Sequence, residues 1–184
     1  MNQNILKNIL NPTIFEENRL PAHSDHSVYA NKSELLKGNS SLIYPLNGVW
    51  KFDYSINLNC TPDGFEALDY DCKNWEDIRV PAHIQMEGYD RPHYANVAYP
   101  WDGRQALKSG EAPTDFNPVA GYVKYFTLPN DFIKDSLILR FEGVESAAAI
   151  WLNGHYIGYC EDSFTPSEFD LTEYIVEGEN KLAI

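Results

Sequence analysis

The sequence is poor in cysteine and in positive charge, and it contains no long hydrophobic run. Its three cysteines, Cys60, Cys72 and Cys160, form no Cys-x-x-Cys pair, which argues against a disulfide framework or a zinc site and favours reduced thiols. The 14 Lys and Arg residues are outnumbered by 27 Asp and Glu residues, and the net charge of −13 argues against nucleic acid and anionic membranes as partners. No run approaches the ~20 apolar residues of a membrane span, and the first residues do not resemble a signal peptide. We therefore expect a cytoplasmic protein.

Several common signatures of catalysis are absent as well. The five histidines form no His-Glu-x-x-His motif, no serine lies in a Gly-x-Ser-x-Gly turn, and neither a Gly-x-Gly-x-x-Gly sequence nor a P-loop occurs. A glycosidase needs two carboxylates about 5–9 Å apart, but nothing in the sequence selects a pair from 27 acidic residues. The chain therefore offers no catalytic site that its own motifs identify.

Aromatic residues are abundant, at 14 %, and many follow the two-residue period of β-strands. Trp50, Phe52 and Tyr54 alternate with other residues directly after an Asn47-Gly48 turn. The same analysis predicts strands over 75–80, 122–128, 137–142, 148–152, 155–159 and 180–184, a type I′ hairpin at Asn153-Gly154, and a short helical turn over 172–176. Eight or so short strands with turns between them indicate an all-β fold, an antiparallel sandwich or jelly roll.

The first 45 residues lack this alternation and are interrupted by prolines. We expect residues 1–45 to form an extended N-terminal arm, with one or two helical turns that stop before Pro12, and residues 46–184 to form the β-domain. The sequence ends at Leu182-Ala183-Ile184, inside an apolar strand pattern without a polar tail. This ending predicts a jelly roll that is truncated at its C-terminal end and cut from a longer protein.

The segment 80–101 combines polar groups with aromatic rings more densely than the rest of the chain. Sugars present both hydroxyls and C–H faces, so polar donors among rings are what a sugar site requires. A loop whose rings merely cover the end of the sandwich would show the same pattern, and the spacing leaves both interpretations open. The residues concerned are Gln85, Asp90, Arg91, His93 and Asn96 among Tyr89, Tyr94, Tyr99 and Trp101.

The same segment resembles the N-terminal domain of family 2 β-galactosidases. The resemblance lies in the run from Gln85 to Asp90, followed by Asn96-Val97 and Tyr99-Pro100, and it extends from about residue 8 to the end of the chain. Further motifs in matching order are Asn18-Arg19-Leu20, Leu46-Asn47-Gly48, Phe141-Glu142-Gly143-Val144, Asn153-Gly154, Pro166-Ser167-Glu168-Phe169-Asp170-Leu171 and Gly178-Glu179-Asn180. The resemblance implies a galactose-binding-domain-like jelly roll within a retaining β-galactosidase that hydrolyses terminal β-D-galactosides such as lactose.

The resemblance also implies where the chemistry lies. The catalytic glutamates of the family lie on a later (β/α)8 barrel, so no catalytic residue is expected in this chain, which should be inactive alone. Asn96 matches the asparagine that hydrogen-bonds the galactosyl unit. A peripheral Mg²⁺ site of the family corresponds to Asn11, the Ile14 carbonyl and Glu161, although Asn8 replaces an aspartate there. The family's Na⁺ lies near an aspartate whose segment falls after Ile184.

Two other functions stay open beside this one. The chain could be a stand-alone carbohydrate-binding module, because the jelly-roll shape serves many such modules. It could instead be a purely structural or oligomerisation domain. For the truncated sandwich we expect contacts with the rest of a β-galactosidase chain, and self-association through exposed strand edges.

Overall fold

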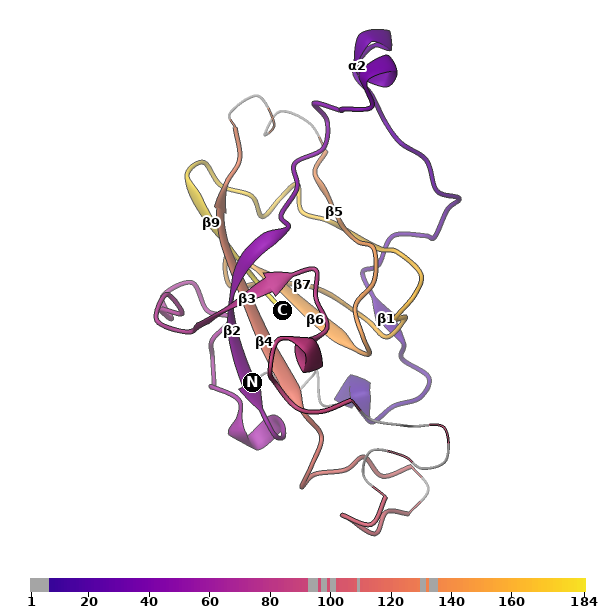
Figure 1. Cartoon of the computed structure of the whole chain (residues 1–184), viewed down its shortest axis with the longest axis vertical. Coiled ribbons are helices and arrows are strands. Elements are labelled where there is room, and N and C mark those ends of the chain that lie inside the picture. Colours follow the sequence, from indigo (N-terminus) through magenta and orange to yellow (C-terminus); the bar gives the residue numbers. More distant parts are fainter. Residues whose placement is uncertain are drawn as a thin grey trace.

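The computed structural model describes residues 7–92, 96, 99, 102–108, 110–129, 132 and 136–184. Within them, antiparallel strands form a seven-stranded sheet in the order β1-β7-β6-β9-β4-β2-β3 and a two-stranded sheet of β5 and β8 (Figure 1). The strands are β1 (Glu16–Glu17), β2 (Gly48–Ser55), β3 (Glu76–Val80), β4 (Val119–Thr127), β5 (Ile138–Phe141), β6 (Ala148–Leu152), β7 (His155–Cys160), β8 (Ser167–Asp170) and β9 (Glu179–Ala183). The helices are α2 (Lys32–Lys37) and the 3₁₀ turns η1 (Leu58–Cys60) and η2 (Ile84–Met86), and residues 7–9, before Pro12, are also helical as predicted.

Because successive side chains of a strand point to opposite faces of a sheet, apolar residues of the strands form one layer on each face of the large sheet. One layer lies between the two sheets and includes Trp50 and Phe52 from β2 and Phe169 from β8. The other lies on the opposite face of the large sheet, where Phe65 and Cys72 of the 61–75 loop pack on neighbouring strands. Burial on both faces stabilises the sheet, and the predicted all-β sandwich is confirmed.

The predicted hairpin at Asn153-Gly154 is confirmed between β6 and β7. Asn153 has φ 53° and Gly154 has φ 83°, and a type I′ turn requires two such left-handed residues. Asn153 is also buried, and its side-chain Nδ2 donates to the Tyr174 carbonyl (2.9 Å) and to Asn180 Oδ1 (2.8 Å). The Asn-Gly motif therefore fixes both a turn and a buried polar pair.

Of three further sequence predictions, one is confirmed in shorter form and two need correction. Residues 172–174 form a turn in which the Leu171 carbonyl accepts from the Tyr174 amide at 2.9 Å and from the Ile175 amide at 3.2 Å, so the predicted helical turn is present and shorter than expected. Strand β4 begins at Val119 and not at residue 122, and it therefore includes Gly121. A Cβ atom at position 121 would lie 3.1 Å from the Trp75 ring, so this position favours glycine. The arm is also more regular than predicted, because it contains β1 and α2.

The arm crosses from one sheet to the other. Strand β1 pairs with β7, and Asn18 then donates through Nδ2 to the Ile157 carbonyl at 3.0 Å. Two residues on, the Leu20 amide donates to the Glu168 carbonyl of β8 at 2.8 Å. Beyond this crossing the chain leaves the sheets and forms α2, which stands apart from them in Figure 1 and buries none of its side chains. No helix of the described segments is long and apolar enough to cross a membrane.

Candidate functional site

The first half of the predicted sugar segment is fixed against the large sheet. After η2, the Tyr89 amide donates to the Ile84 carbonyl at 3.1 Å and closes a compact turn. The Tyr89 ring then packs on Phe52, with ring centroids 4.5 Å apart, at the border of the main core. Tyr89 therefore covers the end of the sandwich, which was one of the two interpretations that the sequence left open.

The Tyr89 hydroxyl gives this anchor a polar component. It donates to Glu76 Oε2 of β3 at 2.5 Å, and the carboxylate of Glu76 raises the pKa of Tyr89 to about 12 by favouring the neutral phenol. Nearby, Arg79 of β3 pairs with Glu87 at 3.0 Å. Two side-chain pairs thus join the segment before Asn96 to strand β3.

Charged groups and rings gather beside this anchor at the end of β2. Burial raises the pKa of the half-buried Tyr54, the negative charge of Asp90 adds to this effect, and Arg104 opposes it. The Arg104 guanidinium lies 3.7 Å above the centre of the Phe116 ring. Rings beside ionised groups are suited to a polyhydroxylated ligand, because C–H faces stack on rings while hydroxyls bind the charges.

Gln105 bridges the two sides of the described part of the 102–117 loop. Gln105 donates through Nε2 to Thr114 Oγ1 at 2.9 Å and accepts from the Thr114 amide at 2.8 Å. Asn117 fastens the loop to the sheet, since its amide donates to the Ile56 carbonyl at 3.0 Å. The loop thus stands at the same end of the sheet as Tyr54, away from α2 (Figure 1).

Asn96, the predicted galactosyl contact, is exposed and lies in a turn. Its chain neighbours 93–95 and 97–98, and with them the predicted site residues His93 and Tyr94, lie outside the described residues, as does Trp101. An exposed carboxamide can donate and accept together, which suits recognition of a sugar hydroxyl. The role of Asn96 stays a prediction.

The residues predicted to hold Mg²⁺ come from the arm and from the end of β7. Asn11 Oδ1 accepts from the hydroxyl of Thr13 at 2.8 Å, and the Ile14 amide donates to the Asn11 carbonyl at 2.9 Å. The Glu161 amide donates to the Phe15 carbonyl at 3.1 Å, next to this turn. All three predicted ligands are oxygens, which fits a hard cation, but Glu161 alone carries charge. In the described segments no three His, Cys, Asp or Glu side chains form a group that could hold a metal ion.

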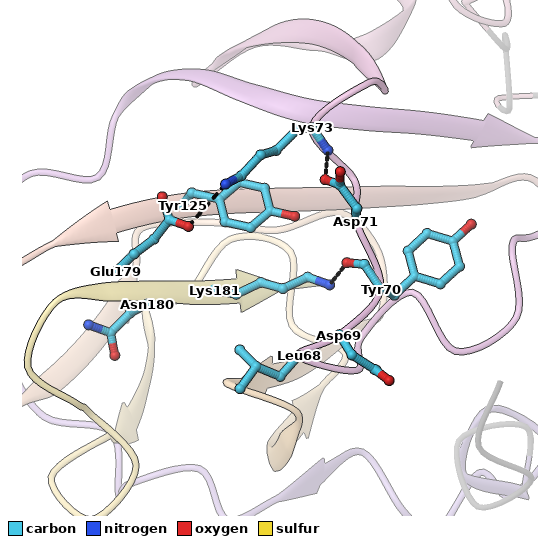
Figure 2. A pocket seen from close by; sticks show the side chains of 9 residues that line it. All are labelled: Leu68, Asp69, Tyr70, Asp71, Lys73, Tyr125, Glu179, Asn180 and Lys181. Atoms are coloured by element: carbon cyan, nitrogen blue, oxygen red, sulfur yellow. Dashed lines mark hydrogen bonds and ion pairs between the residues drawn. The ribbon is translucent and has the colours of Figure 1, made fainter.

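A pocket of about 170 Å³ lies on the other face of the large sheet, where β9 meets the 61–75 loop (Figure 2). Beneath it, Lys181 of β9 is 2 % exposed and donates through Nζ to the carbonyls of Phe65 (2.8 Å), Ala67 (2.6 Å) and Tyr70 (2.6 Å). Burial lowers the pKa of Lys181. Sequence reasoning missed this residue; its signal was a lysine in an otherwise apolar strand. Its three bonds give it a structural role.

Comparison with known proteins agrees with this architecture. Residues 43–184 match the model of the family described as glycosyl hydrolases family 2, sugar binding domain. The β-galactosidase of Halalkalibacterium halodurans is 54 % identical over 172 residues, which cover 93 % of this chain and 17 % of that protein. The β-galactosidase of Streptococcus thermophilus is 41 % identical over 185 residues, which cover 100 % of this chain and 18 % of that protein. The chain thus spans less than a fifth of the length of these relatives.

A solved structure shares the fold. The β-glucuronidase of Bifidobacterium dentium aligns with a TM-score of 0.54 and 23 % sequence identity, covering 76 % of this chain and 19 % of that one. The family model covers most of the described sandwich, and the two β-galactosidases extend the similarity into the arm. This chain therefore belongs to glycoside hydrolase family 2 and is its sugar-binding domain, as the sequence motifs predicted.

Proposed function

We propose that this chain is the non-catalytic N-terminal domain of a retaining β-galactosidase that hydrolyses terminal β-D-galactosides such as lactose. The domain supports an active site carried by the rest of the enzyme and contributes one galactosyl contact, the carboxamide of Asn96. The observation that carries this proposal is the identity of 41–54 % with two β-galactosidases across nearly the whole chain.

The arrangement at the loop end of the sandwich supports the role given to Asn96. The segment before it is anchored by Tyr89, and the 102–117 loop after it is held by Gln105. Such supports reduce the entropy lost when an exposed side chain binds a sugar. We propose that the Asn96 carboxamide forms its hydrogen bond with a hydroxyl of the galactosyl unit.

Hydrolysis of matched galactosides and glucuronides by the longest natural form of the protein tests the substrate. Several structures that share the fold are β-glucuronidases, so a chromogenic β-glucuronide is the matched alternative. We expect cleavage of the galactoside and little of the glucuronide. The 184-residue chain alone should cleave neither, and a clean preparation of it that hydrolysed the galactoside would refute the non-catalytic role.

Binding of sugar to the chain alone separates this proposal from a stand-alone carbohydrate-binding module. A single wall of a shared site should bind galactose or lactose negligibly. Calorimetric titration that gave millimolar or tighter binding would favour the module instead.

We also propose that Asn11, the Ile14 carbonyl and Glu161 bind Mg²⁺ in the longest natural form of the protein, with waters completing the shell. When bound, the ion would link the arm to the end of β7. Added Mg²⁺ should then raise the Tm of the wild-type protein and leave that of Glu161→Gln unchanged. The exposed Glu173→Gln is the matched control and should respond as the wild type does.

Self-association is a further part of the proposal. In the described residues, β3 pairs on one side with β2 and borders no other strand. An unpaired strand edge can pair with another chain. Light scattering of the 184-residue chain should therefore show an oligomer, and a monodisperse monomer would contradict this.

A further inference from the structure

The side chain of Glu168 in β8 accepts hydrogen bonds both from the arm and from the neighbouring strand β5. The carboxylate of Glu168 accepts from His23 Nε2 of the arm at 2.9 Å and from Arg140 Nη1 of β5 at 3.3 Å. Its side chain is only 16 % exposed. Because the Glu168 carbonyl also accepts from the Leu20 amide, this residue holds the arm through both its backbone and its side chain.

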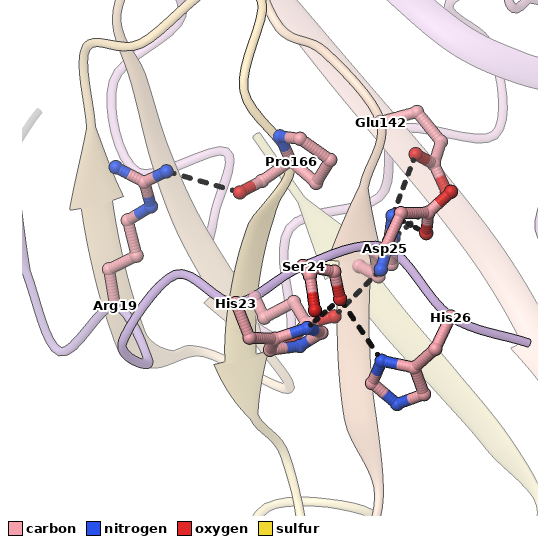
Figure 3. A network of polar contacts seen from close by, with 9 residues as sticks. Arg19, His23, Ser24, Asp25, His26, Glu142 and Pro166 are labelled. Carbon is pink, nitrogen blue, oxygen red and sulfur yellow. Dashed lines mark hydrogen bonds and ion pairs between the residues drawn. The ribbon is translucent and has the colours of Figure 1, made fainter.

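Both nitrogens of the His23 ring face groups that can only accept hydrogen bonds. Nδ1 lies 2.9 Å from the Ser24 carbonyl oxygen (Figure 3), and Nε2 lies 2.9 Å from the Glu168 carboxylate. A neutral imidazole carries one N–H and can satisfy only one of these acceptors, whereas an imidazolium carries two and satisfies both. The geometry therefore matches the doubly protonated ring.

The Glu168 carboxylate favours the same state, and the nearby Arg140 guanidinium opposes it. Arg140 of β5 pairs with Asp25 of the arm (2.9 Å), with Glu142 after β5 (2.9 Å) and with Glu168. One guanidinium thus serves three carboxylates, and a proton on His23 offsets part of the excess negative charge. The remaining titratable neighbour is His26, whose Nδ1 lies 3.2 Å from the same Ser24 carbonyl.

We propose that residues 18–26 of the arm form a proton-dependent latch, which is fastened to the β5–β8 sheet when His23 is doubly protonated and loosens when His23 loses a proton. The hydrogen bonds to Ser24 and Glu168 raise the pKa of His23 above its usual value of 6.5. A raised folded-state pKa means that this stabilisation is complete below pH 6.5 and is lost as the pH rises through the higher value. The arm is therefore held more firmly in weak acid than in weak base.

Hydrogen exchange of the longest natural form of the protein tests this latch. The reporter is the Leu20 amide, since its hydrogen bond to Glu168 joins arm and sheet. We expect its protection factor, corrected for intrinsic exchange, to be about two- to fivefold higher at about pH 5.5 than at about pH 8.5. This fold-change corresponds to the free energy that an exposed ion pair typically contributes. The Tyr122 amide, bonded to Ile184 inside the large sheet, is the internal control and should not respond.

Matched variants assign the effect to His23. The pH dependence at Leu20 should disappear in His23→Gln and in Glu168→Gln, and should persist in His26→Gln, because the hydrogen bond of His26 in the described residues goes to the Ser24 carbonyl and not to Glu168. Exchange of the imidazole C2 hydrogen, followed by mass spectrometry, gives the pKa of His23 independently, and we expect it above 6.5. Equal protection at the two pH values, a pH dependence that survives His23→Gln, or a His23 pKa at or below 6.5 would each overturn the proposal.

Discussion

The hydroxyl of Tyr89 donates a 2.5 Å hydrogen bond to Glu76, and this contact joins the segment that leads to Asn96 to strand β3. The same tyrosine ring packs on Phe52, so one side chain combines an apolar and a polar anchor. An anchor of this kind restricts the path of the chain toward Asn96.

Removing that hydroxyl should destabilise the protein modestly. We expect Tyr89→Phe to lower the free energy of unfolding by about 1 kcal/mol, measured by urea denaturation at neutral pH. Because the bond needs the neutral phenol, its contribution is complete below about pH 10 and is lost as the pH approaches the pKa of about 12. Tyr29→Phe, in the arm, is the control and should have no effect. An equally stable Tyr89→Phe protein would show that the contact stabilises nothing.

Lys181 should be far more important for stability than an exposed lysine. Lys181→Met removes the ammonium donor from three carbonyl groups of the 61–75 loop, and we expect it to lower the free energy of unfolding by about 3 kcal/mol. Lys73 pairs with Glu179 at 3.3 Å near the same pocket, but both side chains are more than half exposed. Lys73→Met should therefore cost less than about 0.5 kcal/mol in the same urea titration. Similar losses for the two variants would contradict the structural role of Lys181.

The absence of a side chain at Gly158 of β7 should be necessary for β1 of the arm to pair closely with β7. A Cβ at this position would lie 2.5 Å from the Glu17 carbonyl oxygen of β1 and 2.6 Å from the Phe169 ring. We expect Gly158→Ala to weaken β1–β7 pairing, seen as faster hydrogen exchange in these strands, and to cost about 1–3 kcal/mol of stability. In Gly38→Ala, at the end of α2, only the positive φ is strained, so exchange in β1 should stay unchanged. Unaltered exchange in Gly158→Ala would mean that the arm tolerates the extra carbon.

Strands with strong alternation could be predicted from the sequence, and short paired segments could not. Trp50 and Phe52 identify β2 because a half-buried strand needs apolar residues at every second position. Strand β1, by contrast, is two glutamates whose backbone pairs with Tyr159 and Cys160, so its strand structure depends on β7. Helix α2 has end signals at Asn31 and Gly38, but it buries nothing and so lacks an apolar stripe.

The candidate site was predicted less completely than the fold. The mixture of rings and polar groups identified the region, but the pattern is the same for a ring that binds sugar and for one that covers the core, as Tyr89 does. Only the resemblance singled out Asn96 among these polar groups, because an exposed asparagine in a turn has no distinguishing periodicity. Asn153 and Asn180, which also belong to family motifs, form a buried pair at 2.8 Å and are explained by the fold.

The most direct test of the account is kcat/KM of the longest natural form of the protein for a β-galactoside, with Asn96 intact and in Asn96→Ala. The exposed Asn74→Ala, in the turn before β3, is the matched control and should leave kcat/KM unchanged. Loss of one sugar hydrogen bond predicts a decrease of about 1–3 kcal/mol in transition-state stabilisation, roughly 5- to 150-fold in kcat/KM. An Asn96→Ala enzyme with the wild-type kcat/KM would contradict the claim that this domain contributes to sugar recognition.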